Sequence, residues 1–314
     1  MTLNHKIFLR YLHERYEAVA KYREDCGTAA DEVLKTLDYG DNKQEQDYDN
    51  AHIQDLYAVR YMYAYGYEYR EMFRRLFRTQ ELPSKSGILS IGCGNGIDFW
   101  AAVEARDLEL TPQGKGLTIQ YTGLDLANWQ NLWGKDFPNK YTFKRANADY
   151  LMNTGIDEFL KAHPVLPYNI IVFPKVISEL PDSVFEDMCT AFQNATFQGQ
   201  TWSGHMFNIK KVYFFISLRR DISVSMDDCA PLDKMRSDRL IEAMEENDFV
   251  VEDREAAEIV AGDDQKIVEC DPDFFYPTDI NDGMRELANA GISNLPMKSA
   301  SYVCNRIIIF LCNA

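Results

Sequence analysis

The chain has 314 residues, of which 46% are hydrophobic and 26% are charged, the balance of a folded globular protein and not of a disordered one. That length is enough for one large α/β domain, or for one of ordinary size with a smaller helical attachment. The formal charge is −16, residues 221–290 carry 21 acidic against 6 basic side chains, and no stretch clusters lysine and arginine, so nucleic acid is a disfavoured partner.

Residues 1–80 contain no proline and have apolar residues at helical spacing, which predicts a helical region. We divide the chain into a helical cap region, 1–82, and a second domain, 83–314. The last predicted helix, 55–78, has an aromatic residue at every fourth position: Tyr57, Tyr61, Tyr65, Tyr69, Phe73 and Phe77. Because residues four apart share a helix face, we interpret this stripe as packing against neighbouring helices or a sheet. The alternative is that some of the tyrosines line a ligand pocket, since a phenol combines a flat apolar ring with a polar tip.

From residue 87 onward, short apolar runs alternate with helical stretches, the pattern of a parallel sheet covered on both faces. The predicted strands are 87–91, 120–124, 142–145, 169–173 and 212–218, with two more apolar runs at 249–251 and 302–311. A helix is predicted at 232–247, and the prolines and glycines of 261–300 indicate an insertion before the last strand. The predicted fold class is therefore α/β, with a doubly wound sheet.

The cysteines, apolar runs and acidic residues indicate which metals, membranes and partners to expect. The seven cysteines form no Cys-x-x-Cys pair and have no histidines at zinc-like spacing, so we expect neither a metal site nor a disulfide framework. The chain has no run of about 18 apolar residues and no cleavable leader pattern, so we expect a cytoplasmic location and no membrane span. We interpret the acidic segment 221–290 as solvated surface, with a docking surface for a basic partner as the alternative.

A glycine-rich turn follows the first predicted strand. Residues 88–102 read ILSIGCGNGIDFWAA: an apolar strand, a Gly-x-Gly-x-Gly turn and an amphipathic helix. Glycine lets the backbone turn sharply and lets a ligand approach atoms that a Cβ would shield, and the helix adds unpaired N–H groups at its first turn. The turn lacks the Gly-Lys-Ser/Thr ending of a P-loop, and Ile97 stands where the dinucleotide fingerprint has its third glycine. The pattern therefore favours a nucleotide-like ligand but disfavours a phosphate cradle.

An acidic residue, Asp125, ends the second predicted strand, 33 residues after Gly92. A carboxylate in this place can accept hydrogen bonds from both hydroxyls of a ribose. The spacing exceeds the roughly 20 residues of the dinucleotide unit, and the polar stretch 107–116 accounts for the extra length. The alternative is that Asp125 is a solvated strand end or a helix cap for Asn128.

These residues resemble the class I S-adenosylmethionine-dependent methyltransferases, over about residues 85–260 and the last strand. In that family the glycine turn packs against the amino-acid part of the cofactor. The resemblance therefore implies a floor formed by Gly92, Cys93, Gly94 and Gly96. The acidic residue after the second strand holds the ribose in the family, which implies that role for Asp125, with Leu126 beside the adenine. The implied cofactor is S-adenosylmethionine.

The resemblance extends to two later turns and to the last strands. The family presents a pair of residues to the adenine after its third strand, which implies Asn147, Ala148 and Asp149 here, with Asn147 and Asp149 as alternatives for the polar contact. At the end of the fourth strand the backbone borders the reactive methyl, which implies Pro174. The remaining elements match a Rossmann-like sheet that ends in an antiparallel strand pair.

The sequence departs from the family at two places. Ser90 stands where the family often has an acidic residue, which bears on how the cofactor's amino group is held. The fourth strand lacks the Asn-Pro-Pro-Tyr sequence of methyltransferases that act on amino groups of nucleic acids. The segment 178–181, Ser-Glu-Leu-Pro, has a weaker resemblance to ribosome-associated methyltransferase-like proteins, so an RNA-linked role is an alternative.

Methyl transfer from a sulfonium is an in-line displacement, so the protein mainly aligns the acceptor and excludes water. A general base is needed only where the acceptor carries a proton to remove. The titratable candidates near the reacting end are Glu179, Lys175 and His205. We name Glu179 as the candidate for acceptor contact or general base, with a helix-entry or surface role as the alternative.

We therefore predict S-adenosylmethionine-dependent methyl transfer to a small-molecule or protein acceptor, with the helical region covering the cofactor and shaping the acceptor site. One alternative is a protein that binds the cofactor for regulation or another use and transfers no methyl group. Another is a nicotinamide-dependent oxidoreductase, which rests on fold analogy alone. The sequence identifies neither the acceptor nor the oligomeric state.

Overall fold

The protein is represented by a computed structural model that describes residues 2–39, 48–80, 82–110, 116–133, 145–200, 206–218, 231–252, 260–261, 276–297 and 304–312. Within these ranges eight strands form one sheet in the order β10-β11-β8-β5-β1-β2-β3, with β9 paired to β11. The strands are β1 (Lys85–Ile91), β2 (Thr118–Asp125), β3 (Ala146–Met152), β5 (Ile170–Pro174), β8 (Lys211–Leu218), β9 (Phe249–Val251), β10 (Val260–Ala261) and β11 (Cys304–Cys312).

The centre of the sheet is parallel and its far side is antiparallel. β3, β2, β1, β5 and β8 run in the same direction. β11 lies antiparallel beside β8, and both β9 and β10 pair antiparallel with β11. This arrangement confirms the predicted fold class, a Rossmann-like doubly wound sheet with antiparallel strands near its C-terminal end.

Four of the five parallel strands begin and end within two residues of the prediction, because they are apolar runs buried on both faces. The prediction of the third strand was wrong. Arg145, the last residue of the predicted strand 142–145, lies in a turn with a φ of 69°, and residues 142–144 lie outside the described ranges. The true strand, β3, is at the edge of the described sheet. Its Asn147 and Asp149 are exposed, so the strand alternates polar and apolar residues and lacks an apolar run.

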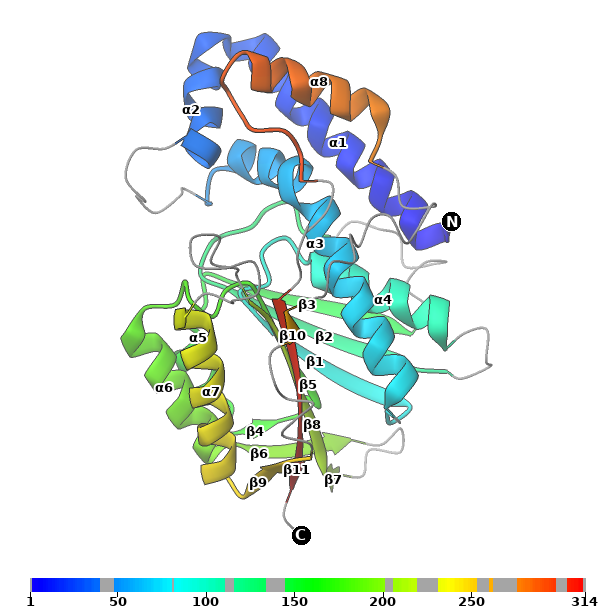
Figure 1. The fold of residues 1–314 in the computed structure, drawn as a ribbon, viewed down its shortest axis with the longest axis vertical. Coiled ribbons are helices and arrows are strands. Elements are labelled where there is room, and N and C mark those ends of the chain that lie inside the picture. The colour runs from blue at the N-terminus through cyan, green and yellow to red at the C-terminus, as the bar shows by residue number, and fades with distance from the viewer. Residues whose placement is uncertain are drawn as a thin grey trace.

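Helices cover both faces of the sheet (Figure 1). On one face lie α3 (Ala51–Thr79) and α4 (Ile97–Glu109), and on the other α5 (Ile156–Ala162), α6 (Asp182–Asn194) and α7 (Pro231–Glu246). Each layer buries its own apolar cluster against the sheet. α3 and α4 approach closely at Gly66, where a Cβ would lie 3.0 Å from side-chain atoms of both Ile97 and Trp100.

Three further helices pack beyond one end of the sheet, together with the first turns of α3 (Figure 1). They are α1 (Leu3–Cys26), α2 (Thr28–Tyr39) and α8 (Thr278–Asn289). α8 comes from the predicted insertion, yet it lies against α1: the Tyr16 ring fills the space that a Cβ on Gly283 would need. Tyr276 and Ser293, on either side of α8, donate hydrogen bonds to Val59 and Asp38. None of the described helices is long and apolar enough to cross a membrane.

A second, small sheet lies at the opposite end of the molecule (Figure 1). It comprises β4 (Val165–Leu166), β6 (Thr196–Gln200) and β7 (Met206–Asn208), with β4 parallel and β7 antiparallel to β6. This sheet was not predicted from the sequence, because β4 and β7 are too short to show a period and all three residues of β7 are exposed.

Candidate functional site

The glycine turn lies between β1 and α4. Gly92, Gly94 and Gly96 all have left-handed backbones, with φ of 72°, 53° and 82°. The N–H groups of Gly92 and Cys93 both donate to the carbonyl of Leu124, at 2.8 and 3.0 Å. The turn is therefore held against the end of β2, the strand that finishes in the predicted ribose-binding residue.

The three glycines differ in what lies beside them. A Cβ on Gly92 would overlap the Val176 side chain, and a Cβ on Gly96 would overlap the Tyr150 hydroxyl. Packing within the chain therefore explains these two glycines without a ligand. At Gly94 the nearest atom to an added Cβ is 3.6 Å away, in the Trp129 ring. Crowding within the chain therefore does not account for Gly94, whose left-handed φ nevertheless favours glycine.

Asp125 connects the end of β2 to the glycine turn. Its Oδ2 accepts a hydrogen bond of 2.8 Å from the N–H of Gly94, and its Oδ1 accepts one of 2.9 Å from Ala127. Burial raises the pKa of Asp125, while the N–H groups of Ala127 and Gly94 oppose the rise. The structure thus brings together two of the predicted site residues, and Leu126, which is 52% exposed, follows beside them.

An aromatic group that sequence reasoning missed lies over this turn. Trp129, which is 5% exposed, packs between Gly94, Tyr48 and Tyr57, with ring-centre distances of 5.5 Å to Tyr48 and 5.2 Å to Tyr57. Its side chain also hydrogen-bonds Asp125. A tryptophan four residues after an acidic strand end is the signal that could have identified it.

The structure corrects the predicted position of the adenine-binding turn. Asn147, Ala148 and Asp149 lie inside β3, not in a turn after the third strand. Ala148 is paired in register with Tyr121, four residues before Asp125, and four residues of strand span about 13 Å. The turn that follows β3 begins at Asn153, beyond Met152, the register partner of Asp125. The error follows directly from placing the third strand too early.

Two other predicted residues lie where β5 ends. Pro174 is the last residue of β5 and pairs with Ser217 of β8. Lys175 follows with a left-handed φ of 59°. Its Nζ lies 3.0 Å from the Glu68 carboxylate of α3, and the hydroxyl of Ser217 donates to the same carboxylate at 2.6 Å. Glu68 is 1% exposed, so the structure holds a buried ion pair between α3 and the strand ends.

Glu179 is exposed and lies close to two tyrosines from the helical region. Burial is the main cause that raises the pKa of Tyr48 and of Tyr57, and the nearby Glu179 carboxylate raises both further. Glu179 therefore acts electrostatically on two members of the aromatic group over the glycine turn. His205, the remaining candidate, lies outside the described ranges.

The aromatic stripe of α3 divides into two parts. Tyr69, Phe73 and Phe77 are buried, and Phe73 stacks on Phe215 of β8 at 4.8 Å. Tyr57, Tyr61 and Tyr65 are only partly buried and lie toward Trp129 and Lys175. The C-terminal half of the stripe therefore packs on the sheet, and the N-terminal half faces the strand ends.

Ser90 stands where the methyltransferase family often has a carboxylate, but another carboxylate, that of Asp98, lies near this position. Asp98, in the first turn of α4, is fully buried and accepts a hydrogen bond of 2.8 Å from the Tyr121 hydroxyl. Burial raises the pKa of Asp98 to about 6, and the nearby hydroxyls of Ser90 and Tyr121 oppose the rise. The helix thus brings a carboxylate to Ser90, which sequence alignment by motif position could not indicate.

Polar side chains from the start of α3 hold the loop after Asp125. Gln54 donates to the carbonyl of Asn128 at 2.9 Å and accepts from the N–H of Gln130 at 2.8 Å. Asp55 accepts from the side chain of Asn131 at 2.7 Å. Both α3 side chains are buried, so the helical region and the candidate site are tied together by satisfied polar contacts.

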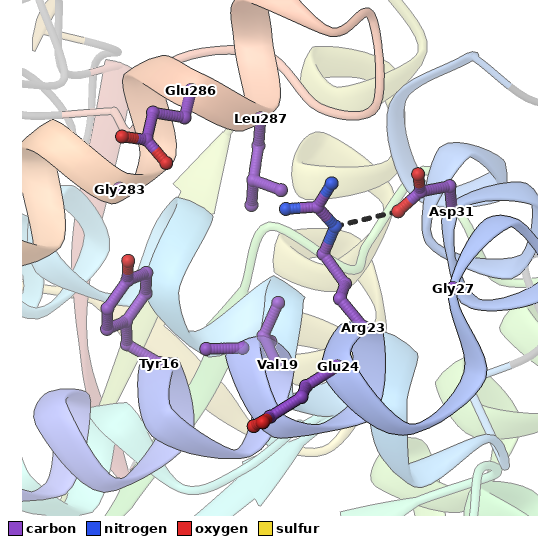
Figure 2. A pocket seen from close by; sticks show the side chains of 10 residues that line it. Tyr16, Val19, Arg23, Glu24, Gly27, Asp31, Gly283, Glu286 and Leu287 are labelled. Atoms are coloured by element: carbon purple, nitrogen blue, oxygen red, sulfur yellow. Dashed lines mark hydrogen bonds and ion pairs between the residues drawn. The ribbon is translucent and has the colours of Figure 1, made fainter.

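A pocket of about 360 Å³ lies elsewhere, between α1, α2 and α8 (Figure 2). Arg23 points into it and donates to Asp31 at 2.7 Å, with Tyr16, Glu24 and Glu286 also on its walls. None of the predicted site residues lines it. In the described ranges no group of three or more His, Cys, Asp or Glu side chains is placed to hold a metal ion. The strand ends therefore remain the candidate site.

No family model and no curated protein matches the sequence. Solved structures do match. An S-adenosylmethionine-dependent methyltransferase from Archaeoglobus fulgidus is 14% identical, over 77% of this chain and 94% of that one, with a TM-score of 0.39. The plantazolicin methyltransferase BpumL in complex with SAH is 13% identical, over 96% and 99%, at 0.35. Loganic acid methyltransferase with SAH is 10% identical, over 87% and 98%, at 0.37.

Methyltransferases are thus among the solved structures that this chain resembles. Each of the three similarities is weak, with a TM-score below 0.5. Similarities at this level carry no argument about the ligand or the reaction. The fold assignment rests instead on the strand order of the chain itself.

Proposed function

We propose that the protein binds S-adenosylmethionine at the ends of β1 and β2 and transfers its methyl group to a small-molecule or protein acceptor. One observation carries the proposal: the N–H of Gly94 is bonded to the Asp125 carboxylate, so a left-handed glycine turn and an acidic strand end form one unit. They do so in a sheet whose strand order ends in antiparallel strands.

The residues at the strand ends fit this cofactor. Gly94 leaves room where a Cβ would be, so its backbone can lie against the amino-acid part. Each oxygen of Asp125 accepts one hydrogen bond from a backbone N–H and, as a carboxylate oxygen, has capacity for another, which suits the two ribose hydroxyls. Leu126 offers exposed apolar surface next to it for the adenine. When bound, the cofactor supplies an electrophilic methyl group.

The chain's own residues would then orient the acceptor and exclude water. α3 carries Tyr57, Tyr61 and Tyr65 above the strand ends, and Trp129 lies against Gly94. Aromatic rings of this size displace water from a large area, which favours alignment of an acceptor. Glu179, whose carboxylate raises the pKa values of Tyr48 and Tyr57, is the candidate to contact the acceptor or take a proton from it.

The test is thermal unfolding of the purified protein with S-adenosylmethionine, S-adenosylhomocysteine or NAD. A ligand at about 100 times its dissociation constant should stabilise the folded state by roughly 2.7 kcal/mol. We expect a shift with the first two ligands and none with NAD. A shift with NAD alone would support the oxidoreductase alternative, and no shift with any ligand would contradict the site. Binding without formation of S-adenosylhomocysteine over a broad acceptor screen would favour the alternative of a non-transferring binding protein.

A further inference from the structure

The pocket between α1, α2 and α8 lies between two helix faces that touch at one point. On α1, Tyr16, Val19 and Arg23 are three and four residues apart, so they share one face. On α8, Gly283 and Leu287 share a face in the same way. The helices touch where the Tyr16 hydroxyl fills the place of a Cβ on Gly283. Beside this contact the pocket opens to about 360 Å³, within the range of about 300–1,000 Å³ for small-molecule sites, and the buried Val19 and Leu287 give it apolar walls.

Arg23 presents hydrogen-bond donors to this pocket. Its Nε donates to Asp31 of α2 at 2.7 Å, and Figure 2 shows its two Nη atoms turned from α1 toward α8. Within the described ranges neither Nη donates a hydrogen bond. The side chain of Arg23 is 34% exposed, so these donors are open to a ligand. A guanidinium holds its N–H groups in a planar fork that matches the two oxygens of a carboxylate.

Glu286 presents a carboxylate to the same pocket from α8. Figure 2 shows this carboxylate across from the Tyr16 ring of α1. Glu286 is exposed and makes neither an ion pair nor a hydrogen bond with another residue that the structure describes. Glu24, on α1, adds a second exposed carboxylate to the walls, and it too has no partner in the described part of the chain. The pocket therefore has carboxylates available to a cationic group.

The charges on the walls favour a ligand that carries both signs. Asp31 balances the Arg23 guanidinium, so the carboxylates of Glu24 and Glu286 leave the pocket negative as a whole. A simple anion would contact Arg23 but would be repelled by these two carboxylates. A simple cation would be attracted by them but would use none of the Nη donors. A small molecule with one carboxylate and one ammonium group has a partner for each charge.

We propose that this pocket binds an amino acid, with the ligand's carboxylate on the Nη atoms of Arg23 and its ammonium group on Glu286. The apolar part of the ligand lies against Val19 and Leu287. The bound amino acid thereby joins α1 to α8, which are more than 250 residues apart in the chain. The site is separate from the proposed methyl-transfer site, none of whose residues lines the pocket, and it does not depend on that proposal.

The experiment is isothermal titration of the full chain with three sets of probes. They are leucine with 3-methylbutylamine and 4-methylpentanoic acid, phenylalanine with 2-phenylethylamine and 3-phenylpropanoic acid, and 4-aminobutanoic acid with propylamine and butanoic acid. Each amine lacks the carboxylate of its set, and each acid lacks the amino group. In at least one set the amino acid should bind about tenfold tighter, or more, than both relatives, the scale of one hydrogen bond to a charged group. A smaller preference in every set, or no amino acid bound, overturns the proposal.

Two variants test the two ends of the ligand separately. In Arg23→Gln the amino acid and its amine should bind alike, because the partner of the carboxylate is gone. In Glu286→Gln the amino acid and its acid should bind alike, because the partner of the ammonium group is gone. The matched controls are Arg285→Gln, at a side chain 60% exposed on α8, and Glu242→Gln, at one 64% exposed on α7. Both controls should keep both preferences. Preferences that survive in the first two variants contradict the assignment.

Hydrogen exchange of the backbone amides locates the ligand in the unaltered chain. Because the bound amino acid joins α8 to α1, a saturating concentration should slow exchange in residues 278–289. Ala20→Trp puts a large ring into the pocket at an exposed position of α1 and removes no charge, so it tests the site even if Arg23→Gln does not fold. This variant should lose both the binding and the protection of α8. Binding retained in Ala20→Trp, or binding without slower exchange in α8, overturns the proposed location.

Discussion

The N–H of Gly94 and the Oδ2 of Asp125 are joined by a hydrogen bond of 2.8 Å, which ties the turn after β1 to the end of β2. Removal of this carboxylate by Asp125→Ala should weaken S-adenosylmethionine binding by about 1–3 kcal/mol, the range for polar groups left unpaired. Isothermal titration of the folded variant measures the loss. Asp149→Ala, which removes an exposed carboxylate inside β3, is the matched control and should bind as the wild type does. Unchanged affinity in Asp125→Ala would contradict the ribose assignment.

Gly96 should be intolerant of a side chain for two separable reasons. Its φ of 82° is left-handed, which costs an alanine about 1–2 kcal/mol, and an added Cβ would also overlap the Tyr150 hydroxyl. Gly291→Ala isolates the first cost, because Gly291 has a φ of 66° and nothing within 4 Å of an added Cβ. In urea unfolding, Gly96→Ala should therefore lose more free energy of unfolding than Gly291→Ala. Equal losses of free energy of unfolding would show that the Tyr150 side chain moves away from the added Cβ without destabilising the protein.

The buried carboxyl of Asp98 should make stability depend on pH. Burial raises its pKa to about 6 from an ordinary value of 3.8. Between about pH 4 and 6 the folded state thus keeps a proton that the unfolded state has lost, so the free energy of unfolding falls as the pH rises through this window. A shift of two units corresponds to about 3 kcal/mol. In Asp98→Asn, which does not titrate, the fall between pH 4 and 7 should be smaller by up to that amount; a fall equal to that of the wild type would count against the buried site.

Removal of one partner of the Lys175–Glu68 pair should lower the free energy of unfolding more than replacement of both partners does. Glu68 is fully enclosed and also accepts a hydrogen bond from Ser217, so Glu68→Gln leaves the Lys175 ammonium without its counter-charge. Loss of one partner of a buried pair costs about 3–5 kcal/mol. The double variant Glu68→Gln, Lys175→Met should recover part of this loss in chemical denaturation. If the double variant is less stable than Glu68→Gln alone, Lys175 has a stabilising role apart from the pair.

The sequence was informative where one local pattern decides the structure. β1 and the glycine turn follow from an apolar run and from backbone angles that favour glycine, and both occur where predicted. β3 was misplaced because an edge strand needs no continuous apolar run. Trp129, Glu68 and Asp98 were missed because their importance comes from contacts across the fold. Such contacts leave no periodic trace in the chain.

The position of α8 has a consequence for the order in which the molecule can assemble. Tyr276 bonds to Val59 of α3, Ser293 bonds to Asp38 of α2, and Gly283 packs against Tyr16 of α1, so the first three helices complete their packing with residues more than 200 positions later. During synthesis these helices emerge long before their partner does. Contacts of such long sequence separation form late and slow folding. The nascent helical region must therefore wait with part of its apolar surface uncovered, and this is the stage at which the chain is most exposed to aggregation or to capture by chaperones.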